Sequence, residues 1–240
     1  MKNRKKDSSA STVFYLKYVK PRYTKDIIKG KFYFTKVRYF KDLGLNGDNN
    51  IGDLNEGHIT KKSLPGEWKT IKLNGESFDI TDCEVTLNRQ ILSDEQYNEI
   101  GIFSLIAVTT DDLVFVEENE NGRKFKLKKE FIEDCKKIDP DNQRDLVAIP
   151  KNCFYNFKKE QQGYIKYYNS TYSKSLPTLS KDNWTTLFYK DKSYEFQHEY
   201  RLIKSINNGN YLEIVSGLPK IILVKDIEKI EVIRKKQFNC

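Results

Sequence analysis

The 240-residue sequence is poor in metal-binding side chains, with four Cys and two His. No two cysteines have the C-x-x-C spacing, and only His58 and His198 could complete a ligand set with them. Structural zinc sites use closely spaced Cys and His ligands, so this scarcity argues against a zinc site. It also favours reduced thiols, which are typical of a cytoplasmic protein.

Long apolar runs are absent as well. No apolar segment is long enough to span a membrane, and the charged, Ser-rich residues 1–11 lack the apolar stretch of a signal peptide. We therefore expect a cytoplasmic protein without membrane contact. Residues 1–11 are predicted to form a flexible basic tail, and residues 12–240 a single domain.

Charged and aromatic residues are abundant instead. The sequence is 32% charged and contains 14 Phe and 15 Tyr, which supply large apolar surfaces for a core in an otherwise polar chain. Its net charge of +8 favours anionic partners, such as nucleic acid, a phosphorylated cofactor or an acidic protein.

Hydrophobic patterns predict more short strands than helices. Aromatic and β-branched runs predict strands that include residues 13–19, 31–37, 102–110 and 163–169. Helices are expected after Thr24, read as an N-cap, and over residues 93–101 and 128–138. This pattern indicates an α+β fold with a mixed or mostly antiparallel sheet core and a few short helices.

The segment YEFQHEYRL, residues 194–202, alternates in a way typical of an extended strand. His198 would lie on the apolar face, and Gln197, Glu199 and Arg201 on the polar face. Two interpretations of the polar face remain open. It is either an ordinary solvated surface or one wall of an active site.

Several segments in order resemble bacterial proteins of the DUF2971 family, a domain of unknown function. They are YLKYV, GYIKYYN, LFYKDKSYEFQHEYRLI and the final IILVKDIEKIEVI. The same layout is similar to the ADP-ribosyltransferase fold, in which a late strand supplies a catalytic Glu, often as Gln-x-Glu. Gln197-His198-Glu199 matches that pattern.

The resemblance implies an NAD-dependent ADP-ribosyltransferase-like enzyme that modifies a protein or nucleic acid, as a toxin or in phage–host conflict. Glu199 would be the catalytic carboxylate, and Gln197 would position the acceptor.

The same resemblance implies a binding site for NAD. Lys17 or Tyr18 takes the first-strand position, and Thr35 supplies a hydroxyl from the second strand. Arg201 would keep Glu199 ionised or bind a phosphate.

Two further functions remain open. The first is a non-catalytic protein that docks on a host protein or nucleic acid through a basic, Tyr-rich surface. It is motivated by YLKYV, which lacks the Arg or His that the first strand of the ADP-ribosyltransferase pattern carries. The second is a metal-dependent nuclease that uses Asp111-Asp112 or Asp53 together with Glu199 and Arg201.

Overall fold

A computed structural model describes residues 10–47, 53, 56–155, 157–158, 161–170, 183–207, 209–213 and 220–235. Most of the predicted tail, residues 1–9, therefore lies outside the described residues.

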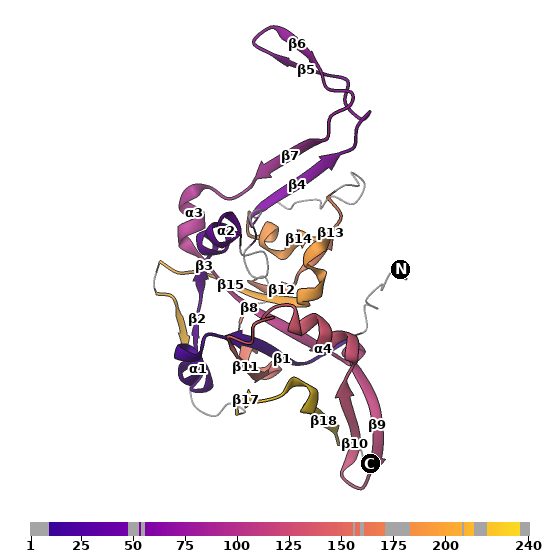
Figure 1. Cartoon of the computed structure of the whole chain (residues 1–240). Coiled ribbons are helices and arrows are strands. Elements are labelled where there is room, and N and C mark those ends of the chain that lie inside the picture. The colour runs from indigo at the N-terminus through magenta and orange to yellow at the C-terminus, as the bar shows by residue number, and fades with distance from the viewer. Residues whose placement is uncertain are drawn as a thin grey trace.

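The centre of the molecule is a seven-stranded sheet (Figure 1). Its strands follow the order β12 (Gln162–Tyr164), β15 (Glu199–Ser205), β8 (Ile100–Thr109), β1 (Thr12–Val19), β11 (Asp145–Pro150) and β17 (Ile222–Val224), and β3 (Thr35–Lys36) pairs with β8. All of these pairings are antiparallel. The predicted α+β class with a mostly antiparallel sheet is confirmed.

Four short α-helices accompany this sheet in the described part of the chain. They are α1 (Pro21–Ile28), α2 (Val37–Leu45), α3 (Asp94–Glu99) and α4 (Lys129–Lys136). Ser93 begins α3 with a reciprocal capping box to Gln96, as its sequence indicates. Helix α4 buries Phe131, Ile132 and Cys135.

The sheet carries apolar clusters on both faces. Tyr15 and Leu105 belong to one cluster, whereas their chain neighbours Leu16 and Ile106 belong to another, with Phe131 of α4. Because alternate residues of a strand point to opposite faces, this division follows from the pattern of β1 and β8. Strand β8 is buried along nearly its whole length, as expected for a central strand.

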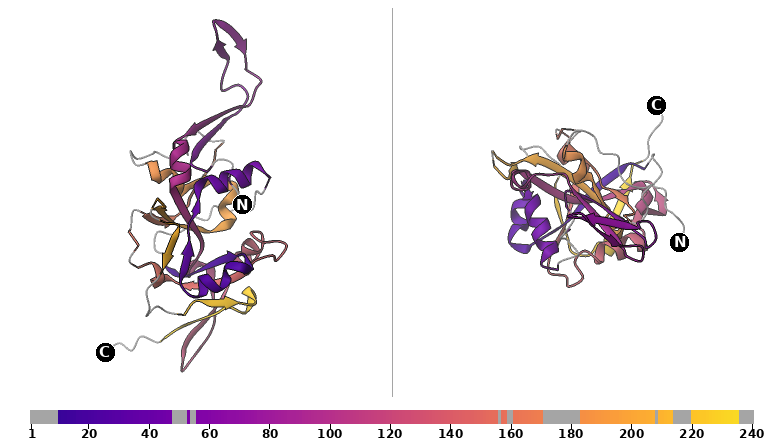
Figure 2. Two further views of the ribbon diagram at one scale, coloured as in Figure 1. Left: turned by 90° about the vertical axis from the view of Figure 1, so that its left-hand side faces the viewer. Right: turned by 90° about the horizontal axis from the view of Figure 1, so that it is seen from above.

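Two β-structures extend beyond the central body (Figures 1 and 2). The longer arm consists of β4 (His58–Ser63) paired with β7 (Val85–Gln90), and beyond them β5 (Thr70–Leu73) paired with β6 (Glu76–Asp79). The other combines β9 (Leu113–Asn119), β10 (Gly122–Leu127) and β18 (Glu231–Arg234). The dipeptide Asn121-Gly122 favours a hairpin turn here. Strands β9 and β10 do form a hairpin, but its turn residues are Glu120 and Asn121, because Gly122 already pairs with Asn119.

The remaining short elements connect these parts. Strand β2 (Lys31–Tyr33) pairs with β16 (Tyr211–Glu213), and β13 (Lys166–Tyr168) lies parallel to β14 (Tyr189–Asp191). The 3-10 helices are η1 (Thr110–Asp112), η2 (Lys151–Phe154), η5 (Asn183–Phe188), η6 (Lys192–Gln197) and η7 (Ile227–Lys229).

Four local predictions were wrong. Thr24 does not cap a helix: α1 begins at Pro21, whose fixed φ suits a first helical position, and the Thr24 hydroxyl donates to Asp145. The predicted strand 31–37 divides into β2 and β3, and strand 163–169 divides into β12 and β13.

The fourth error concerns YEFQHEYRL, which is a strand only from Glu199 onward. Residues up to Gln197 form η6, and His198 adopts a left-handed conformation with φ 46° and ψ 39°. Alternation within a short aromatic segment does not distinguish a strand from a 3-10 turn followed by a strand.

Candidate functional site

The polar face of β15 is buried, not solvated. Glu199 is 5% exposed and Arg201 is 1% exposed. In the antiparallel register, Glu199 lies opposite Ile106 and Arg201 opposite Ser104, so all four side chains share one face of the sheet. Two charged groups on this face must be paired, because an isolated buried charge is very costly.

Arg201 is the centre of the resulting ion network. Its Nη1 and Nη2 donate to the two oxygens of Glu56 at 2.6 and 2.8 Å, and its Nε donates to Glu199 at 2.6 Å. Its Nη1 also donates to the Leu187 carbonyl at 2.6 Å, and its Nη2 makes a longer hydrogen bond to Glu199 Oε2 at 3.3 Å. A guanidinium has five N–H donors, and all five are used. Arg201 therefore holds Glu199 ionised but has no donor left for a phosphate.

Glu199 is held from four directions. Besides the two Arg201 contacts, Ser104 Oγ donates at 2.6 Å and Lys190 Nζ lies 2.9 Å from Oε2. Burial would raise the pKa of this carboxyl, but the charges of Arg201 and Lys190 and the hydrogen bonds outweigh it and hold the pKa far below its usual range. Glu199 is therefore a fixed anion and not a proton acceptor near neutral pH.

Gln197 reaches the same cluster from a different element. It lies at the end of η6, and its Oε1 accepts from Lys190 Nζ at 2.9 Å. Lys190, on β14, thus joins Gln197 to Glu199. The left-handed turn at His198 makes this approach possible, while the His198 ring packs on Phe131 with centroids 4.9 Å apart.

Lys17 lies where β1 separates from β8. The last β1–β8 pair is Leu16–Ile106, and β3 takes up pairing with β8 only at Ile102. In this interval the Lys17 ammonium donates a hydrogen bond to the Ser104 carbonyl at 2.6 Å. It also lies 4.2 Å from the centroid of the Phe103 ring. Burial lowers the pKa of Lys17 to about 8, Arg144 adds to that effect, and Glu199 opposes it.

A cavity of about 670 Å³ opens at this separation. All six residues predicted from the sequence line it: Lys17, Tyr18, Thr35, Gln197, Glu199 and Arg201. They come from β1, β3, η6 and β15, so the fold brings together residues far apart in the chain. Their shared location is a structural fact, whereas their roles in catalysis and NAD binding stay predictions.

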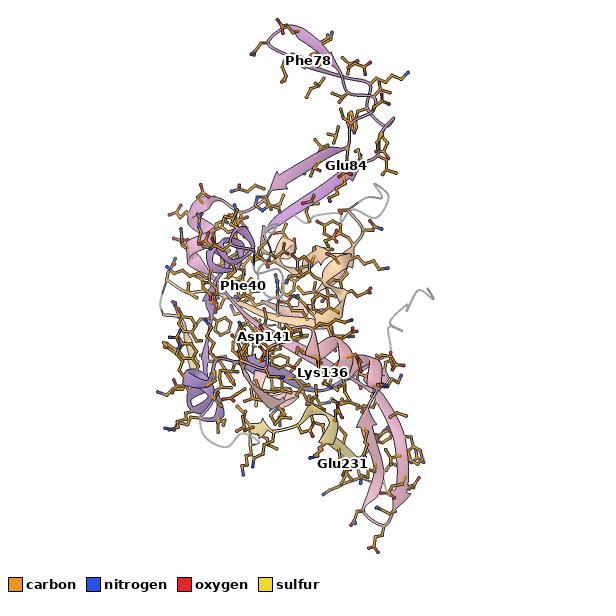
Figure 3. The ribbon with its side chains drawn as sticks, in the orientation of Figure 1. Phe40, Phe78, Glu84, Lys136, Asp141 and Glu231 are labelled. Carbon is orange, nitrogen blue, oxygen red and sulfur yellow. The ribbon has the colours of Figure 1, made fainter. Side chains whose placement is uncertain are left out.

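The cavity is strongly cationic and rich in aromatic rings. Its charged lining residues are one carboxylate, Glu199, and seven cations: Lys17, Lys20, Arg22, Lys36, Arg144, Lys190 and Arg201. The aromatic members are Tyr18, Tyr23, Tyr33, Tyr39, Phe40, Phe103 and Tyr211. Figure 3 labels Phe40, which lies in the central body.

Apart from Lys17, the cations fall into two groups. Lys190 and Arg201 are neutralised by Glu199 and Glu56. Lys20, Arg22, Lys36 and Arg144 also line the cavity, and none of these four has an ion-pair partner among the described residues. This unpaired positive charge can attract and hold an anionic ligand.

The carboxylates proposed for a nuclease are not gathered at the cavity. Asp112 accepts from the Thr109 amide and hydroxyl at 2.8 and 2.6 Å in η1, and neither Asp111 nor Asp112 lines the cavity. Asp53 is buried outside the cavity lining. Within the described ranges, no three His, Cys, Asp or Glu side chains are grouped as they would be to hold a metal ion.

Sequence reasoning missed Glu56, Lys190, Ser104 and Arg144. The loop composition around Glu56 favours a turn over a cleft-lining role, but Glu56 is 1% exposed and binds Arg201 through both oxygens. A signal was present, because an Arg on a buried strand needs more than one carboxylate oxygen to satisfy its donors. No sequence pattern connects Lys190 or Arg144 with β1.

Comparison with protein-family models, curated sequences and solved structures finds no match to this chain. The resemblance to DUF2971 proteins and to ADP-ribosyltransferases therefore stays a prediction. In the described part of the chain, no helix has the length and apolar character needed to cross a bilayer.

Proposed function

We propose that this chain binds a nucleotide of the NAD class in the central cavity and that its reaction is ADP-ribosyl transfer. The observation that carries the proposal is the cavity lining, in which the predicted site residues occur together with unpaired cations and aromatic rings. Its volume of about 670 Å³ lies within the range of small-molecule sites, about 300–1,000 Å³.

The lining supports recognition of both parts of a nucleotide. Lys20 and Arg22 at the start of α1, Lys36 before α2 and Arg144 before β11 can pair with phosphate oxygens. Tyr33 and Tyr211 form an edge-to-face pair with centroids 5.2 Å apart and can pack against a planar base. A free inorganic anion would use only the first group, so base-dependent affinity distinguishes a nucleotide site.

The catalytic part of the proposal rests on Glu199. Cleavage of the nicotinamide–ribose bond develops positive charge on the ribose, which a fixed carboxylate stabilises. Glu199 is ionised, immobilised by three hydrogen bonds and an ion pair with Lys190, and located on the cavity wall. Its contribution would be electrostatic, and Gln197, linked to it through Lys190, would position the acceptor.

Nicotinamide release from NAD tests this reaction. We expect wild-type protein with its acceptor to release nicotinamide, and Glu199→Gln to lose at least about a hundredfold in rate, since removal of one electrostatic stabiliser has that order of effect. Glu195→Gln, an exposed residue of η6, is the matched control. Both variants need a circular dichroism melt, because Glu199 also holds Arg201.

The acceptor is tested separately with labelled NAD and cytoplasmic extract. Transfer of label to protein or to nucleic acid would support a cytoplasmic effector that acts as a toxin or in phage–host conflict. Equal nicotinamide release by wild type and folded Glu199→Gln would instead remove Glu199 from the reaction.

A second candidate function is non-catalytic docking on another protein through the β4–β7 arm. This arm exposes Leu64, Trp68, Ile71, Leu73, Phe78 and Leu87, and Figure 3 shows Phe78 near its far end. Residues 58–90 contain equal numbers of cations (Lys61, Lys62, Lys69, Lys72, Arg89) and anions (Glu67, Glu76, Asp79, Asp82, Glu84). This balance disfavours nucleic acid as its partner.

The docking function is tested by replacing residues 67–80 with an Asn-Gly turn, since the Gly66 amide donates to the Thr81 carbonyl at 2.6 Å and closes the loop. The shortened chain should keep its melting temperature and NAD binding but lose the toxicity that we expect of the whole chain when it is expressed in host cells. An unchanged cellular effect would exclude the arm from function.

A further inference from the structure

The Lys17 amine differs from the other cations of the cavity in its surroundings. Like four other cations of the lining, it has no ion-pair partner among the described residues, but its one hydrogen bond goes to the Ser104 carbonyl. It lies against the Phe103 ring. An amine that is desolvated in this way and faces a cavity resembles the chemical setting in which lysines act as nucleophiles.

The charged groups that face Lys17 come from two other elements. Glu199 on β15 favours the ammonium form, and Arg144, just before β11, disfavours it. Arg201 and Lys190 are paired with Glu199 and reduce its influence. The β8 contacts, Phe103 and the Ser104 carbonyl, are uncharged. With its pKa lowered to about 8, Lys17 carries a substantial neutral fraction near pH 7.5.

We propose that Lys17 forms a Schiff base with an aldehyde or ketone that carries an anionic group, held in the cavity by the unpaired cations Lys20, Arg22, Lys36 and Arg144. This activity goes beyond nucleotide binding and does not require it. The two share the cavity and its four unpaired cations, but the bond to Lys17 belongs to the Schiff base alone.

The reaction balances without a further reagent. The neutral Nζ of Lys17 attacks the carbonyl carbon and forms a C–N bond, and the carbonyl oxygen takes up a proton. Loss of water from this adduct then gives the C=N bond of the imine. The anionic group of the substrate contributes affinity through the cations and takes no part in bond formation.

Reductive trapping tests the inference on the whole chain, without nucleotide. Pyridoxal 5′-phosphate serves as an anionic aldehyde and pyridoxal as the matched aldehyde without phosphate. Borohydride adds hydride to the imine carbon and fixes the label, which peptide mass spectrometry then locates. We expect Lys17 to be labelled about tenfold faster than Lys25, an exposed lysine outside the cavity lining, because a substantial fraction of the Lys17 amine is neutral at pH 7.5 and lies beside the bound anion.

Two further readouts separate this site from general lysine labelling. The labelling rate of Lys17 should rise with pH and level off just above pH 8, and pyridoxal should react with it more slowly than pyridoxal 5′-phosphate. Lys17→Met should lose the fast-labelled site, whereas Lys25→Met, which removes an exposed lysine outside the cavity lining, should keep it.

Peptide mapping of the wild type decides the question even if Lys17→Met fails to fold. Labelling of Lys17 at or below the rate of Lys25, or equal rates with both aldehydes, would overturn the proposal. Neither result depends on NAD, so nucleotide binding can fail while the Schiff base is observed, or the reverse.

Discussion

At the scale of single residues, the site depends on Arg201. One guanidinium neutralises two carboxylates that come from opposite parts of the chain, Glu56 before β4 and Glu199 on β15. Burial of such groups is costly, and the cost is offset only while every partner is present. The cluster therefore connects the stability of the fold to the electrostatics of the cavity.

We expect Arg201→Met to destabilise the protein by about 3–5 kcal/mol, because it leaves buried carboxylates without their cation. Arg123→Met is the control: it removes a similar bond to Glu118, 2.9 Å long but exposed, and should cost less than about 1 kcal/mol. Urea denaturation of the three proteins measures both values. Similar losses for the two variants would contradict the buried network.

The lowered pKa of Lys17 predicts that the stability of the fold depends on pH. Its pKa is about 8 in the folded chain against an ordinary value of 10.5. Between these pH values the unfolded chain binds more protons, so the Lys17 contribution to the free energy of unfolding increases with pH and is complete above 10.5.

The measurement is the difference in unfolding free energy between wild type and Lys17→Met across that window. It should move in favour of wild type by about 1–3 kcal/mol from pH 8 to 10.5. Lys36→Met, which removes an exposed lysine of the same cavity, should show no such trend. A flat difference for Lys17→Met would contradict a desolvated Lys17.

At the scale of elements, the transition from η6 to β15 places the polar groups. His198 has positive φ, which is uncommon for residues other than Gly and unfavourable for β-branched ones. It is held there by the Phe131 ring and by a 3.1 Å contact between its Nε2 and Asp134.

His198→Asn and His198→Val both remove these contacts, but only Asn readily adopts the left-handed conformation. We expect the free energy of unfolding of His198→Val to be about 1–3 kcal/mol lower than that of His198→Asn, measured by thermal or urea denaturation. Equal stability would mean that the turn is not fixed in this conformation.

Sequence periodicity predicted the elements with strong local signals. Strand β8 is a long apolar run, α3 has its capping box and α4 its apolar stripe, and each depends on neighbours within a few residues. Two interruptions of the predicted strands depend instead on tertiary contacts. They are Ile165, which separates β12 from β13, and the left-handed turn at His198. In the same way, Glu199 could be proposed from its segment, but Glu56 and Lys190 could not, because their partners are distant in the chain.

At the scale of the whole molecule, positive charge is concentrated at the cavity. The sequence predicted an anionic partner from a net charge of +8, but it could not say where that partner binds. The projecting arm is neutral in its residue charges, whereas the cavity lining is cationic. The separation of β1 from β8 creates this cavity, and no local pattern indicates where two strands will part.

Calorimetric titration of the full chain with NAD tests the central claim most directly. The account predicts saturable binding that weakens as salt increases. It also predicts at least about tenfold loss of affinity in the Lys20→Ser, Arg22→Ser double variant, since charge-assisted bonds to phosphate are among the strong ones. Lys25→Ser, on the same helix but outside the cavity lining, should bind as wild type does. No saturable binding of NAD, or equal affinity in the double variant and wild type, would contradict the account.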